Sequence, residues 1–127
     1  RLEARDGRIE RGGAALLLTG WDARADSAAA WFGDEAPRRL SFPGFGRSAA
    51  QLLIERGVVG IGVDTPGVDR GCDPTNPVHN TTLPAGVWHL EGLANLAALP
   101  ARGALLVVGA LKLVGGSGTP ARVLALV

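Results

Sequence analysis

The residues of this sequence that could do chemistry together are two histidines, a glutamate and two aspartates. His79 and His89 are the only histidines among the 127 residues, and Glu91 follows His89 by two positions. Asp64 and Asp69 precede them in the chain. Imidazole and carboxylate groups together suit Zn²⁺ or Mn²⁺. One histidine with one glutamate makes only half a coordination shell, so the spacing leaves open both a metal site and a set of polar side chains with a structural role.

The sequence motifs of several other enzyme classes are either absent or lie in the wrong structural context. Gly60-Ile61-Gly62 lies within a predicted strand and not between a strand and a helix, so it is no dinucleotide fingerprint. The glycine-rich loop at 115–120 lacks the Gly-Lys-Ser/Thr ending of a phosphate-binding loop, and the sequence contains no Gly-x-Ser-x-Gly elbow. Cys72 is the only cysteine, which excludes an internal disulfide and a multi-thiolate zinc site within one chain.

The composition indicates a folded protein without a nucleic-acid or membrane partner. Hydrophobic residues make up 46% and charged residues 20%, and the formal net charge is only +1. No apolar run approaches the ~20 residues that span a bilayer, and no signal-peptide pattern is visible, so we expect a cytoplasmic location. The sequence contains no methionine. We therefore expect a fragment or a processed chain.

Alternating apolar runs and amphipathic patterns predict a mixed β-sheet with flanking helices. The predicted strands are 14–19, 58–63, 86–90, 104–114 and 122–127. Helices are predicted near 27–32, at 47–56 and at 91–99. Residues 64–84 carry four prolines and are predicted to be irregular, with His79 in a loop that Pro77 stiffens.

Several side chains have two interpretations at this stage. Asp64 ends a predicted buried strand, where α/β proteins place functional groups, but it could instead cap the turn Asp64-Thr65-Pro66. His89 would share a strand face with Glu91 and is expected to be a pocket or surface residue without a ligand role. Trp21, Trp31 and Phe32 could wall a pocket for an aryl substrate or pack in the core.

Six phrases in a fixed order carry a resemblance to a known family. They are LLLTGW at 16–21, FPGF at 42–45, GVDTPGVD at 62–69, PVH at 77–79 with a glutamate twelve residues after the histidine, LANLAALP at 93–100 and LKLVGGSGTPAR at 111–122. In this order and spacing the sequence resembles the second half of the cyclase family, the kynurenine formamidase-like and isatin hydrolase-like metal-dependent hydrolases.

The resemblance implies a fold and a set of ligands. It implies the swivelling β/β/α fold with its N-terminal part missing, and residues 1–127 as a single domain that forms the C-terminal portion. His79 and Glu91 correspond to metal ligands for Zn²⁺ or Mn²⁺, with Glu91 also catalytic and with Asp64 or Asp69 orienting His79. The candidates Asp64 and Asp69 come from the general need of a metal-bound imidazole for a partner at its second nitrogen and not from the family. The family motif His-x-Gly-Thr-His-x-Asp-x-Pro-x-His, which supplies the other ligands and a catalytic histidine, is absent from this chain.

The activity implied is hydrolysis of a carbon–nitrogen amide bond in a small cyclic or aryl-formamide-type substrate. It would require the missing metal-binding segment, supplied upstream or by a second chain. Alone, the chain is expected to be inactive and to bind metal weakly. Because a cut sheet exposes strand edges, we also expect a homo-oligomer or an assembly with the missing half and not a monomer. The alternative is a truncated, non-catalytic domain that serves as a ligand-binding or oligomerisation module.

Overall fold

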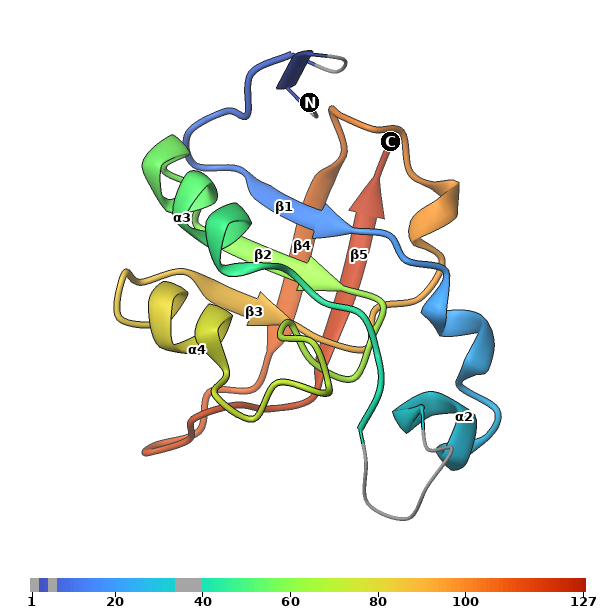
Figure 1. The fold of residues 1–127 in the computed structure, drawn as a ribbon. Helices are drawn as coiled ribbons and strands as arrows, with labels where there is room; N and C mark the ends of the chain where they lie inside the picture. Colours follow the sequence, from blue (N-terminus) through green and yellow to red (C-terminus); the bar gives the residue numbers. More distant parts are fainter. Residues whose placement is uncertain (1–2, 5–6, 34–39) are drawn as a thin grey trace. The chain divides into compact units, whose positions relative to one another are not determined.

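The structure is a computed structural model that describes residues 3–4, 7–33 and 40–127 (Figure 1). The chain divides into two compact units, Arg1–Leu96 and Ala97–Val127. In chain order the elements are β1 (Ala14–Leu17), η1 (Trp21–Arg24), α2 (Ala28–Phe32), α3 (Arg47–Arg56), β2 (Gly60–Val63), α4 (Pro77–Thr82), β3 (Trp88–Leu90), η2 (Leu96–Ala98), β4 (Leu105–Ala110) and β5 (Ala121–Leu126). The predicted mixed α/β fold class is confirmed, whereas the single domain stays a prediction.

A parallel sheet of three strands organises the first unit. The strand order is β1-β2-β3, and both neighbours run parallel to the central strand. Every residue of β2 is buried, as the continuous apolar run of its sequence predicts for a parallel strand. Because the three strands run in the same direction, their carboxyl ends meet at one edge of the sheet. Asp64 follows β2 at that edge and Glu91 follows β3.

Helix α3 forms with the bounds that the sequence predicts. Ala50 and Leu53 are its buried residues and contribute to the core cluster with Ile61 and Val63 of β2. Gly57 ends the helix with a φ of 73°, and its amide donates to the carbonyls of the last turn. This left-handed conformation carries little cost for glycine, which explains the sharp C-terminus.

Two predictions for the region between 64 and 99 are wrong. His79 lies in helix α4 and not in a loop, because Pro77 occupies the first turn, where a fixed φ and a missing amide suit a helix start. The predicted helix at 91–99 is reduced to the short η2 turn. Gly92 and Asn95 adopt φ values of 65° and 61°, and the amide of Gly92 donates to the carbonyl of Thr65. This segment therefore follows the sheet edge and does not form the predicted α-helix.

The second unit contains an antiparallel hairpin with much apolar surface. Strand β4 pairs with β5 from Leu105↔Leu126 to Ala110↔Ala121, so β4 ends four residues before the predicted strand does. Leu105, Leu124 and Leu126 are 62%, 53% and 58% exposed. Exposed apolar surface of this kind is typical of contact sites between proteins. The predicted oligomer or assembly with a missing half remains a prediction that this surface supports.

Among the described residues no helix has the length and apolar character that crossing a membrane requires.

Replacing Leu53 with alanine tests the core between α3 and β2. Leu53 is 5% exposed, so its loss leaves a cavity and should lower the free energy of unfolding by about 2–5 kcal/mol. Leu83→Ala is the matched control, because Leu83 is 52% exposed and its truncation should change stability by only about 0.5 kcal/mol. Denaturant unfolding measures both, and equal losses in the two variants would contradict the described core.

Candidate metal centre

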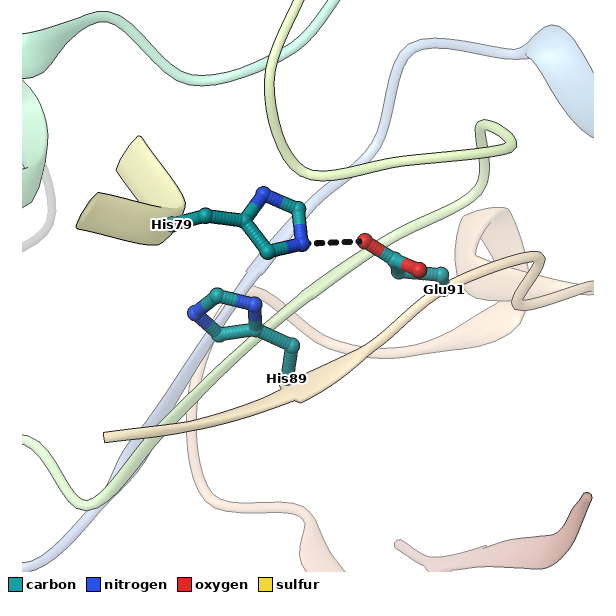
Figure 2. Close-up of side chains that lie close together, drawn as sticks. All are labelled: His79, His89 and Glu91. Atoms are coloured by element: carbon teal, nitrogen blue, oxygen red, sulfur yellow. Dashed lines mark ion pairs between the residues drawn. The ribbon is translucent and has the colours of Figure 1, made fainter. Parts of the chain in front are cut away.

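His79, His89 and Glu91 come together at the carboxyl edge of the parallel sheet (Figure 2). One potential ligand atom from each side chain lies within 4.8 Å of the other two. His89 belongs to β3, Glu91 follows that strand directly, and His79 is contributed by α4. Alternation along the strand places His89 and Glu91 on one face, as the sequence predicts. The structure thus brings the two predicted ligands together and adds His89, for which no ligand role was expected from the sequence.

Asp69 orients His79. Its Oδ2 atom lies 2.6 Å from the Nδ1 atom of His79, and the carboxylate is almost fully buried. The same carboxylate accepts hydrogen bonds from the backbone amides of Val78 and His79, at 2.6 Å and 3.1 Å. An ionised carboxylate can only accept, so Nδ1 of His79 carries a proton and Nε2 of the neutral ring has a free lone pair. Carboxylate–histidine pairs of this kind commonly support a metal-ligating imidazole.

The second ring nitrogen of His79 faces Glu91. The Nε2 atom lies 3.4 Å from Oε1 of Glu91, longer than the roughly 2.7–2.9 Å of a charge-assisted hydrogen bond. Two atoms that each lie about 2.1 Å from a tetrahedral ion are separated by about 3.4 Å. The Oε1 atom also accepts a hydrogen bond from the amide of Val68 at 3.1 Å, which helps to hold the carboxylate in place. The donor set and this separation fit a divalent cation.

His89 lies against the His79 ring in a partly buried position. The ring centroids are 4.7 Å apart with an interplanar angle of 81°, and Nε2 of His89 lies 2.7 Å from the hydroxyl of Thr82. Burial is the main cause that lowers the pKa of His89 to about 4; repulsion by His79, when that ring is protonated, acts in the same direction, and the negative charge of Asp69 opposes the shift. His89 is therefore neutral at pH 7. The sequence offered one signal for its position, the two-residue step to Glu91.

Asp64 serves a different part of the structure. Its fully buried carboxylate accepts hydrogen bonds from the amides of Thr19, Gly20 and Trp21 and from the hydroxyl of Thr19. Of the two candidate partners for His79, the structure thus selects Asp69 and not Asp64. The predicted capping role of Asp64 is correct in kind, but the capped turn is 19–21 and not 64–66. Asp64 joins the end of β1 to the end of β2.

The three aromatic residues predicted to wall a pocket are near one another along the chain. The Trp21 indole donates to the carbonyl of Trp31 at 2.8 Å, and the guanidinium of Arg24 lies 4.1 Å from the centre of the Trp21 ring. The ring of Trp31 reaches Gly92, where an added Cβ would lie 3.7 Å from its Cζ2 atom. Phe32 is 43% exposed. Trp31 therefore lies beside the residue that follows Glu91, and a substrate-binding role for the three stays a prediction.

A buried carboxylate behind one imidazole, with a second imidazole and a carboxylate facing it at the edge of an α/β sheet, is a set of donors that suits a divalent metal ion. The family model described as "Putative cyclase" matches residues 1–70. The chain belongs to the cyclase family, and the resemblance seen in the sequence is confirmed.

Individual relatives agree with this family. The chain is 37% identical to the isatin hydrolase of Roseibium aggregatum over 129 residues, which cover 98% of this chain and 49% of that protein. It is 37% identical to the kynurenine formamidase of Salinibacter ruber over 70 residues, 55% of this chain and 32% of that protein. A crystal structure of an isatin hydrolase bound to the product analogue thioisatinate superposes with a TM-score of 0.92 at 36% identity, covering 98% of this chain and 49% of the other. The chain thus spans about half the length of the isatin hydrolases that it matches.

Asp69→Asn tests the support of the site. The amide NH₂ cannot accept, so at least one buried donor of the α4 start or of His79 loses its partner, and stability should fall by about 1–3 kcal/mol. Asp73→Asn is the matched control, because the Asp73 carboxylate lies in a turn near the surface and, among the described contacts, accepts hydrogen bonds only from Thr75. Thermal and denaturant unfolding provide the measurement. A stable Asp69→Asn variant beside an equally stable control would contradict the role assigned to this carboxylate.

Proposed function

We propose that His79 and Glu91 are ligands of a Zn²⁺ or Mn²⁺ ion in a hydrolase that cleaves a carbon–nitrogen amide bond. The substrate class proposed is a small cyclic amide or an aryl formamide. The observation that carries the proposal is the separation of 3.4 Å between Nε2 of His79 and Oε1 of Glu91, with Asp69 behind the imidazole. Support for the substrate class comes from the names of the relatives, an isatin hydrolase and a kynurenine formamidase.

The residues of this chain have separate tasks in the proposed site. A bound divalent ion activates water and polarises an amide carbonyl at neutral pH. Asp69 holds His79 in the tautomer that leaves Nε2 available, and Val68 fixes Oε1 of Glu91. The side chain of Glu91 is 36% exposed, so it can also orient a water molecule or accept its proton. Trp31 beside Gly92 would pack against an aryl ring.

The donors of this chain make up part of the proposed centre. We propose that the family's histidine-rich segment, from an upstream part of the polypeptide or from a second chain, supplies the remaining ligands and the proton-transferring histidine. The exposed apolar residues of β4 and β5 offer surface for such an assembly. A homo-oligomer and a cytoplasmic location belong to the same proposal.

A non-catalytic binding or oligomerisation module is the second candidate. The observation in its favour is the apolar surface of the β4–β5 hairpin, which any partner chain could cover. The reading frame around Arg1 discriminates between the two. A histidine-rich segment upstream supports the hydrolase, and a start codon directly before Arg1 supports the module.

Glu91→Gln in the metal-loaded full polypeptide tests the hydrolase. Loss of one stabilising charge at the reaction centre should lower kcat/KM for isatin or an aryl formamide by about a hundred- to a thousand-fold. The control is Glu55→Gln, since Glu55 is exposed on α3 and should leave turnover unchanged. Steady-state hydrolysis, followed spectrophotometrically, gives both values. Turnover of Glu91→Gln equal to the unaltered enzyme would overturn the assignment.

A further inference from the structure

The hydroxyl of Thr82 determines which nitrogen of His89 carries the proton. Thr82 is fully buried, and its Oγ1 atom donates to the carbonyl of Val78 at 2.7 Å. The same oxygen lies 2.7 Å from Nε2 of His89. A hydroxyl has one proton, and a carbonyl can only accept, so both bonds form only if Nε2 of His89 donates to Thr82. His89 is thereby held with its proton on Nε2 and its lone pair on Nδ1.

The free nitrogen of His89 is directed toward the metal centre. In Figure 2 the nitrogen next to the ring attachment point, Nδ1, lies on the side of the ring that faces His79 and Glu91, while Nε2 points away from them. Nε2 of His79 has a lone pair for the matching reason, since Asp69 accepts the proton of its Nδ1. One ring nitrogen of each histidine and a carboxylate oxygen of Glu91 lie within 4.8 Å of one another, and the two hydrogen-bond networks leave a lone pair on the nitrogen of each ring that faces this group. Three electron-rich groups that face one another are stabilised by a cation between them.

We propose that His89 is a third ligand of the same cation, bound through Nδ1, and that Thr82 positions it. This inference rests on the proposed function, which assigned only His79 and Glu91. Ligands about 2.1 Å from an ion lie closer together than 4.8 Å, so small side-chain rotations bring the three donors to the ion on binding. The weak metal binding expected from the sequence assumed two ligands, His79 and Glu91. With His89 as a third ligand, we expect the chain alone to bind Zn²⁺ more tightly than that. The chain alone holds Zn²⁺ through two histidines and a glutamate.

Four substitutions separate a ligand role from a packing role. His89→Gln places an amide atom near the Nε2 position, which preserves the contact with Thr82 and removes the Nδ1 donor. His89→Asn places an amide oxygen near Nδ1 and loses the contact with Thr82. Thr82→Val removes the hydroxyl that selects the tautomer. Thr81→Val is the control, because among the described contacts the Thr81 hydroxyl bonds only back to the carbonyl of Pro77 in the same helix.

Competition titration of the purified chain with Zn²⁺ and a chelating dye measures the effect. We expect His89→Gln to weaken Zn²⁺ binding by roughly a hundred-fold or more, Thr82→Val by about 10–100-fold, and Thr81→Val hardly at all. His89→Asn should bind more tightly than His89→Gln, although it loses the contact with Thr82. A purely structural His89 gives the reverse order of these two variants, which overturns the inference.

Glu91→Gln in the same titration distinguishes a failure of the His89 ligand role from a failure of the proposed metal centre as a whole. If Glu91→Gln loses Zn²⁺ binding and His89→Gln does not, the inference fails and the proposed function stands. If neither variant loses it, the metal centre itself fails. Imidazole ¹⁵N spectra of the unaltered chain avoid any dependence on variants that fold poorly. They should show the Nε2–H form of His89 without metal and a shift of its Nδ1 resonance on addition of Zn²⁺, and an unmoved Nδ1 resonance refutes the inference.

Discussion

The carboxylate of Asp69 couples the start of a helix to the direction of an imidazole. A buried charge is tolerated only where hydrogen bonds replace its lost hydration. Asp69 obtains them from two amides at the N-terminus of α4, which have no partner within the helix, and from Nδ1 of His79. Helix α4 therefore begins at the Asp69 carboxylate. The first turn of the helix contains His79 and places its Nε2 atom toward Glu91. A change at this carboxylate alters the fold and the site together.

The connection that carries Asp69 also reaches the other elements at this edge of the sheet. Asp64 at its beginning binds the chain after β1, and the amide of Val68 binds Glu91 after β3. Gly44 lets a second segment pass closely, because a Cβ there would lie 2.4 Å from the backbone carbon of Asp69. The phrase GVDTPGVD thus has a structural explanation: its two aspartates, Asp64 and Asp69, link β1 and α4 to the end of β2 through hydrogen bonds. The phrase FPGF provides the close approach.

The sequence predicted the elements whose signals are local, and it missed those that depend on contacts. The apolar run of β2 and the amphipathic pattern of α3, ended by Gly57, were sufficient for both elements. Helix α4 was missed because its stabilising partner, Asp69, lies outside the helix and its proline looks like a breaker. The family resemblance supplied His79 and Glu91; the two-residue step to Glu91 placed His89 on the same strand face, but nothing in the sequence indicated a ligand role for it. Its tautomer depends on Thr82, seven residues away and on another element, a contact that only the folded chain shows.

The central claim is that the carboxylate-supported histidine and its neighbours form a metal centre. X-ray absorption spectroscopy of the Zn²⁺-loaded chain tests it most directly, because imidazole rings give a characteristic multiple-scattering pattern around the metal. We expect imidazole nitrogen at about 2.0–2.1 Å, with carboxylate oxygen at a similar distance. The imidazole contribution should decrease in His79→Ala. A zinc shell of oxygen atoms alone, unchanged by that substitution, would contradict a metal centre at these residues.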